Sequence, residues 1–134
     1  MTDPLEPLDT ARQMWADDPA SRALGMELRD LGAGVAVVAM TVRADMVNGY
    51  AVAHGGLVAA LADSAFALAC NSRGARTVAA GFDVTFLEPA HEGDELVATA
   101  EERALRGRSG LYDVTVRRDR TVIAEFRGRS HALR

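Results

Sequence analysis

The residues with the clearest chemical potential lie at the start of one long apolar segment. His54, Gly55 and Gly56 precede an Ala-rich run, and Asp63 is the one carboxylate inside it. If a helix begins at the glycines, its first backbone amides have no acceptor within the helix and carry the positive end of its dipole. Because glycine has no side chain to shield those amides, an electron-rich oxygen such as a thioester carbonyl can approach them. This pattern indicates polarisation of a carbonyl by amides, with a carboxylate acting at the same group.

Asp63 also has less reactive interpretations. It could face solvent on an amphipathic helix, but residues 57–70 contain only two polar positions, Asp63 and Ser64, so there is hardly a polar face to join. It could cap a second helix that begins at Ser64, but Phe66 stands where a capping box requires Glu or Gln. The lone carboxylate is therefore better explained by function.

The neighbouring residues are ambiguous when taken singly. His54 can be a helix cap or a packing residue, Asn48 can form a turn with the following glycine, and paired glycines commonly form turns. Their combination with Asp63 is more specific than any member. The candidate catalytic residues are Asp63, Gly55, His54 and Asn48.

The spacing between Gly55 and Asp63 predicts that two chains share a site. Eight helical residues span about 12 Å, so a small acyl group cannot touch both on one chain. An antiparallel helix of a second subunit, packed through small side chains, can bring its Asp63 beside the first subunit's Gly55. We therefore expect a homodimer with composite sites. The small residues expected at this helix contact are Ala59, Ala60, Ala62 and Ala67.

Periodicity predicts an α+β fold. A short helix over about residues 8–17 is followed by two strands with a turn at 32–34, and then by one long helix over about 56–72. Four alternating segments come next, with turns at 107–110 and 119–120. This order favours a long central helix wrapped by an antiparallel sheet, whose remaining edges and face a second copy would cover.

Composition restricts the classes of function. A chain of 134 residues with 49% apolar residues fits one domain, placed at residues 1–134. A net charge of −4 disfavours nucleic acid and acidic membrane surfaces as partners, and no segment is typical of a signal peptide or a membrane span. The single cysteine, Cys70, fits the apolar core and a reducing compartment, so we expect a cytoplasmic protein.

Other chemistries lack their patterns. The three histidines are far apart without metal-ligand spacing, so no metal is expected. There is no G-x-S-x-G elbow and no phosphate-cradling G-x-x-x-x-G-K. All 15 basic residues are arginines, and several lie in the C-terminal third, where guanidinium groups can meet a phosphate.

Taken together, the motifs resemble a known family. Asn48, HGG at 54–56 and ADSAFALACNS at 62–72, followed by FDVTFLEPA and by GLYDVTV with AEFRGRSHAL, are similar to the PaaI-type acyl-CoA thioesterases of the hotdog superfamily. The resemblance extends from ALGMEL to SHAL, nearly the whole chain. It implies the hotdog fold, dimers that often pair into tetramers, and thioester sites at the dimer seam.

The resemblance also implies roles for individual residues. Asp63 matches the catalytic carboxylate, and Gly55 matches the amide that polarises the thioester carbonyl. His54 and Asn48 match neighbours that hold the carbonyl and a water.

Water positioning is the point where this sequence departs from the family pattern. Some relatives place a Ser or Thr for this purpose on the strand after the helix, where Ala79 and Ala80 stand here. The role is either unfilled or taken by Ser64 or Thr77. Arg73 is a candidate contact for coenzyme A phosphates. The predicted substrate-binding residues are Gly56, Ser64, Thr77 and Arg73.

The function implied is hydrolysis of aryl-acetyl (phenylacetyl-type) CoA thioesters, with no cofactor beyond the coenzyme A of the substrate. Asp63 would either deprotonate a water or attack to form a mixed anhydride. Two alternatives remain, a hotdog hydratase or dehydratase and a non-catalytic acyl-CoA binding module.

Overall fold

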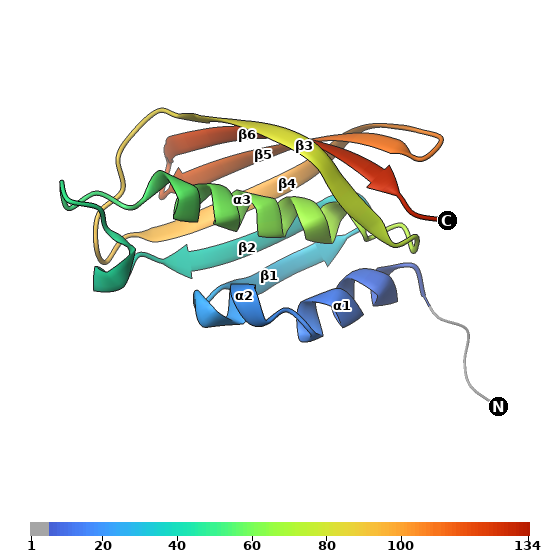
Figure 1. Ribbon diagram of the computed structural model, residues 1–134, viewed down its shortest axis with the longest axis horizontal. Helices are drawn as coiled ribbons and strands as arrows, with labels where there is room; N and C mark the ends of the chain where they lie inside the picture. The colour runs from blue at the N-terminus through green and yellow to red at the C-terminus, as the bar shows by residue number, and fades with distance from the viewer. Residues whose placement is uncertain (1–5) are drawn as a thin grey trace.

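The computed structural model describes residues 6–134; the first five residues of the predicted 1–134 domain lie outside this range. Two short helices, α1 (Leu8–Ala16) and α2 (Pro19–Ala23), come first (Figure 1). The strands β1 (Glu27–Gly32) and β2 (Val35–Thr41), a 3-10 turn η1 (Ala44–Met46) and the long helix α3 (Gly55–Cys70) follow. The last four strands are β3 (Thr77–Phe86), β4 (Glu95–Arg106), β5 (Ser109–Arg118) and β6 (Thr121–Ala132).

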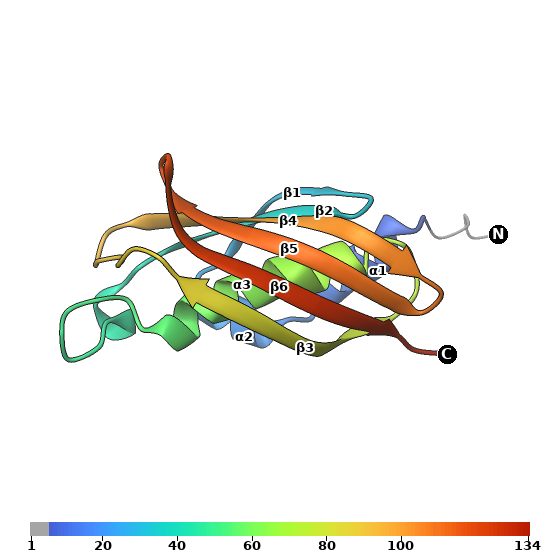
Figure 2. The ribbon, with the colours of Figure 1, turned by 90° about the horizontal axis from the view of Figure 1, so that it is seen from above.

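The strands form one antiparallel sheet in the order β1-β2-β4-β5-β6-β3. The sheet curls around α3, as the two perpendicular views show (Figures 1 and 2). The chain leaves α3 into β3, which pairs only with β6, so β1 and β3 are the two edges. The predicted α+β fold, a long helix wrapped by an antiparallel sheet, is confirmed.

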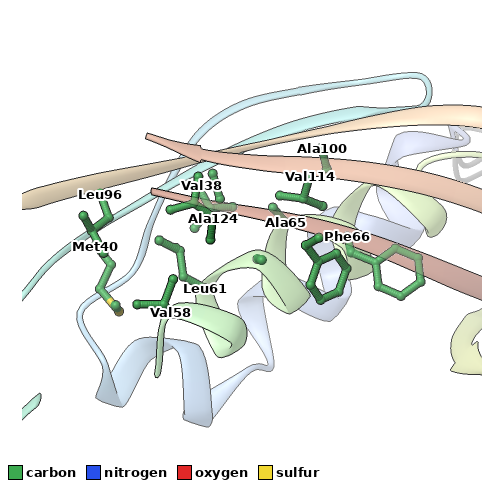
Figure 3. Close-up of a cluster of buried hydrophobic side chains, with 14 of the residues drawn as sticks. Val38, Met40, Val58, Leu61, Ala65, Phe66, Leu96, Ala100, Val114 and Ala124 are labelled. Carbon is green, nitrogen blue, oxygen red and sulfur yellow. The ribbon is translucent and has the colours of Figure 1, made fainter. Parts of the chain in front are cut away.

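The core lies between α3 and the inner face of the sheet (Figure 3). Leu61, Ala65 and Phe66 of α3 are fully buried against side chains such as Val38 and Val114. Burial of each large apolar side chain contributes about 1.5–3 kcal/mol. Helix α3 packs closely on the sheet because small residues such as Gly128 face it. A Cβ at position 128 would stand 2.8 Å from the Phe66 ring, so that strand position requires glycine.

The end of α3 differs slightly from the prediction of about 56–72, because Asn71 ends the helix. Its side-chain amide donates to the carbonyls of Ala67 (2.9 Å) and Thr77 (3.0 Å), and its Oδ1 accepts from the Thr77 amide (2.9 Å). These bonds turn the chain toward β3, and Gly74 follows with φ +99°.

Helix α2 was not predicted, although its start signal is in the sequence. Asp18 caps it, with the carboxylate accepting from the Ser21 amide, and proline occupies the first turn. At five residues it is too short for a periodic apolar pattern to appear.

The edge strand β3 exposes apolar surface. Val78, Phe82 and Phe86 are 46%, 41% and 50% exposed, and Leu87 beyond the strand is 53% exposed. Unpaired edges of this kind invite pairing with another chain. None of the helices within residues 6–134 has the length and apolar character needed to cross a membrane.

Candidate active site

Helix α3 starts with unsatisfied amides. His54 is the N-cap residue in extended conformation; its amide donates to the Met46 carbonyl (2.8 Å), and its side chain makes no capping bond. The His54 carbonyl accepts from the amides of Leu57 (2.9 Å) and Val58 (3.2 Å). The amides of Gly55 and Gly56 have no acceptor within the described residues. The helix therefore presents free donors at its positive end, as the pattern of the sequence predicts.

An apolar cavity of about 370 Å³ adjoins these amides. It lies between the start of α3 and the segment that follows β3, and Glu88 is its one charged wall residue. Its lining is Val52, Ala53, Gly55, Val58, Phe86, Leu87, Glu88, Pro89, Ala90 and Ile123. Sequence analysis missed most of these residues. The alternation of Phe82, Val84 and Phe86 is visible in the sequence, but its alignment with α3 depends on tertiary packing.

Gly55 lies in close contact with the Phe86 side chain. A Cβ there would lie 3.0 Å from the tip of the Phe86 ring. The ring thus packs against the bare backbone at the mouth of the cavity. A Cβ at position 55 would shift the half-exposed ring by a few tenths of an ångström.

Asn48 holds the loop that leads into α3. Its Oδ1 accepts from the amides of Tyr50 (2.9 Å) and Val52 (3.3 Å), and Ala51 in this loop has φ +60°. A hydrogen bond from the Ala53 amide to the Ala90 carbonyl (2.7 Å) connects this loop to the segment after β3 that lines the cavity. The side-chain amide of Asn48 has no acceptor among residues 6–134, so it remains available as a donor.

Asp63 lies two turns along α3 and is partly buried. Burial raises the pKa of its carboxyl group, and the negative charge of Asp18 raises it further. No residue in 6–134 donates a hydrogen bond to this carboxylate. Ala59 and Ala67, one turn to either side, are also partly exposed, so a small-residue stripe passes through Asp63. Ala62 is fully buried in the core and cannot take part in the predicted contact between helices.

The other predicted substrate-binding residues lie in the middle of α3 or beyond its C-terminal end. Ser64 follows Asp63 and is hydrogen-bonded to Ser21 of α2 (2.8 Å). Arg73 and Thr77 lie beyond the other end, about 24 Å from Gly55 for a helix of 16 residues. A single chain therefore does not bring them to the amides of Gly55 and Gly56.

Both distant residues have local partners. Arg73 pairs with Glu102 (2.7 Å), which also accepts a hydrogen bond from the Tyr112 hydroxyl (3.0 Å). The hydrogen bond from Arg73 lowers the pKa of Glu102. The Thr77 hydroxyl donates to the Ala75 carbonyl (2.9 Å).

Cys70 is buried in the core, as predicted. Its thiol donates to the Ala67 carbonyl (3.4 Å). Burial raises the pKa of this thiol to about 12.

A sheet wrapped around a central helix, with free amides and an apolar cavity at the helix start, defines a hotdog protein. The profile of the thioesterase superfamily matches residues 50–125. The chain is 43% identical to acyl-coenzyme A thioesterase PaaI of Escherichia coli strain K12 over 92% of this chain and 89% of the relative.

Solved structures agree with that match. The structure of the E. coli PaaI protein from the phenylacetic acid degradation operon superposes with a TM-score of 0.92 at 40% identity, covering 96% of this chain and 94% of the other. A mutant of phenylacetic acid degradation protein PaaI from Thermus thermophilus gives 0.84 at 41% identity, covering 87% and 100%. The chain belongs to the thioesterase superfamily as a PaaI-type acyl-CoA thioesterase, and is a thioester hydrolase.

Proposed function

We propose that the protein hydrolyses aryl-acetyl-CoA thioesters of the phenylacetyl type to the free acid and coenzyme A. The observation that carries this proposal is the free Gly55 amide at the mouth of an apolar cavity of about 370 Å³. Apolar walls that include the Phe86 ring suit a flat aryl group. The relatives named for phenylacetic acid degradation support the same substrate class.

In this proposal the thioester carbonyl accepts a hydrogen bond from the Gly55 amide. That donor and the helix dipole stabilise the negative charge that grows on the oxygen during attack. His54 and Asn48 flank the carbonyl and a water, and Gly56 leaves the approach open. Asp63 acts in its ionised form, either deprotonating the water or attacking the acyl carbon to give a mixed anhydride that water then cleaves. Thiolate leaves in both routes.

We further propose that Asp63 comes from a second subunit. The exposed apolar edge of β3 and the partly exposed stripe of α3 support an antiparallel homodimer that joins sheets and helices. Such a dimer brings the C-terminal end of the partner's α3 toward Gly55, so Arg73 and Thr77 would approach the substrate from the partner. Pairing of two dimers is proposed from the family resemblance alone.

No cofactor is proposed beyond the coenzyme A carried by the substrate. Cytoplasmic localisation is proposed because the chain has one cysteine and hence no internal disulfide.

The function is tested by thiol release from phenylacetyl-CoA within a panel of acyl-CoAs ranked by kcat/KM. We expect arylacetyl thioesters to rank first and Asp63→Asn to lower kcat by roughly 10²–10⁴-fold. The matched control is Asp17→Asn, which removes an exposed carboxylate on the N-terminal side of α2. Hydrolysis by Asp63→Asn at the parent rate would refute the catalytic assignment. Saturable binding without turnover would favour a binding module, and hydration or dehydration of enoyl and hydroxyacyl thioesters would favour the other alternative.

The shared site is tested by mixing two inactive chains. Co-expression of Asp63→Asn with a chain that lacks the Gly55 amide, Gly55→Pro, gives heterodimers with one intact site of two. About one quarter of the parent activity should return, because about half of randomly paired dimers are mixed. If each site were built within one chain, no activity would return.

A further inference from the structure

A chain of hydrogen bonds connects α2 to the catalytic helix beside Asp63. The Asp18 carboxylate accepts from the Ser21 amide (2.9 Å) through Oδ1 and from the Ser21 hydroxyl (2.7 Å) through Oδ2. The Ser21 hydroxyl oxygen lies 2.8 Å from that of Ser64. Ser21, at the middle of these hydrogen bonds, is only 4% exposed, and Asp18 and Ser64 at the two ends are partly exposed.

The donor and the acceptor of each hydrogen bond in this series follow from the Asp18 carboxylate at its end. An ionised carboxylate only accepts, so the single O–H of Ser21 must donate to Asp18. The hydrogen between the two serines then belongs to Ser64. The Ser64 hydroxyl has no other hydrogen bond among residues 6–134, and its oxygen keeps lone pairs free. Ser64 is therefore held as an acceptor.

We propose that Asp18 and Ser21 are positioning residues that orient Ser64 as an acceptor for the water used in hydrolysis. This inference rests on the proposed function. A water that attacks a carbonyl carbon must direct a lone pair at that carbon and its hydrogens at acceptors. The Asp63 carboxylate is one acceptor and the Ser64 oxygen is the other; both lie toward the start of α2, because Ser64 contacts Ser21 and the Asp18 charge acts on Asp63.

The water's path balances in both routes. In the direct route its oxygen bonds to the acyl carbon, the carbon–sulfur bond breaks, and its proton passes through Asp63 to the leaving thiolate. In the anhydride route the thiolate has already left; the water oxygen bonds to the acyl carbon, the bond from that carbon to the Asp63 oxygen breaks, and the water's proton passes to the released Asp63 carboxylate and on to the thiolate. Neither route needs a further reactant.

The other hydroxyl considered for this role is committed elsewhere. Thr77 donates to the Ala75 carbonyl at the far end of α3. Ala79 and Ala80, on the strand where some relatives carry a hydroxyl, have none. Of the two hydroxyls predicted for water positioning, Ser64 is therefore the one that follows Asp63 on α3.

Asp18→Asn is the sharpest test, because asparagine also caps helices well and so preserves α2. The asparagine Oδ1 can still accept from the Ser21 amide, but its NH₂ group now donates to the Ser21 hydroxyl. Ser21 must then donate to Ser64, and the Ser64 hydrogen turns toward the water. We expect kcat at neutral pH to fall roughly tenfold with KM unchanged, since one hydrogen bond to the reacting water becomes repulsive.

A second readout separates charge from proton direction. In addition to burial, the charge of Asp18, the N-cap residue of α2, raises the pKa of Asp63, and the charge of Asp63 in turn raises the pKa of the buried Cys70 thiol on α3. Removing the Asp18 charge lowers the pKa of Asp63. Asp18→Asn should therefore stay active to lower pH than the parent, although its kcat at neutral pH is lower.

Serine variants complete the test. Ser64→Ala should lose kcat to a similar extent, and Ser64→Thr, which keeps a hydroxyl, should recover most of it. Asp17→Asn, whose carboxylate accepts from the Gln13 side chain (3.0 Å), should change nothing. If folded Asp18→Asn and Ser64→Ala keep the parent kcat while Asp63→Asn is inactive, this inference is wrong and the proposed function stands. If Asp63→Asn hydrolyses at the parent rate, the catalytic assignment within the proposed function fails.

Discussion

The two ends of α3 are built in opposite ways. At the N-terminal end the amides of Gly55 and Gly56 have no acceptor among the described residues, and the cap side chain is not used. At the C-terminal end Asn71 makes three hydrogen bonds that close the helix onto β3. The carboxylates differ likewise, because the pKa of Asp63 is raised by burial and that of Glu102 is lowered by Arg73. One end keeps unsatisfied backbone donors, and the other has its backbone groups satisfied by a side chain.

The largest expected effect comes from removing one amide at the open end. Proline is well tolerated at the first helical position, and His54 already has the extended backbone (φ −60°, ψ 127°) that a following proline requires. Gly55→Pro should lower kcat by roughly 10²–10³-fold relative to Gly55→Ala. Both variants add a Cβ against Phe86, and they differ in the N–H and in the proline ring that replaces it. Equal rates would show that this amide is not the oxyanion donor.

At the closed end, the expected effect is on stability. Asn71→Ala removes the side-chain acceptor of the Thr77 amide and the side-chain donor to the Thr77 carbonyl, while the Ala67 carbonyl keeps the backbone amide of residue 71 as a donor. We expect a loss of about 1–3 kcal/mol in the free energy of unfolding, measured by denaturant titration. The activity of the folded fraction should remain close to the parent's. A drop in kcat without a drop in stability would mean that the closed end also serves the site.

The two carboxylates should respond to pH with opposite signs. A raised pKa in the folded state makes ionised Asp63 destabilising, and this cost disappears below its unfolded pKa. Asp63→Asn should therefore raise Tm by a few degrees at neutral pH, and the difference should vanish in acid. Thermal denaturation at several pH values checks this; a lower Tm for Asp63→Asn at neutral pH would contradict it.

Glu102→Gln is the counterpart and the smallest effect. The lowered pKa of Glu102 means that its stabilising contribution is present above the unfolded pKa and is lost as pH falls through the folded value. Because Arg73 is largely exposed, the loss at neutral pH should be about 1 kcal/mol or less. In the same denaturation series, the stability difference between the parent and Glu102→Gln should become smaller in acid. A difference that grows in acid would reverse the assigned sign.

Part of the difference between the two ends of α3 could be predicted from the sequence. The start of α3 at Gly55 follows from HGG before an apolar run, and the turn at 119–120 follows from the strand pattern around it. The roles of Asn71 and of Asp18 could not be predicted, because each depends on bonds to elements placed by tertiary packing. The cavity wall was also hidden, since alternation places Phe86 on one strand face with Phe82 and Val84 but does not show that it lies over Gly55. Burial of Ala62 shows the same limit, because periodicity alone does not tell which small residues of an apolar helix face the sheet.

The buried Cys70 has a consequence for an enzyme that produces a thiol at every turnover. A thiol with a pKa of about 12 stays protonated at neutral pH, and protonated thiols do not attack disulfides. The protein should therefore escape mixed-disulfide formation with accumulating coenzyme A, even when the solution becomes oxidising. In a colorimetric thiol assay on the folded enzyme, the signal then comes from the product alone.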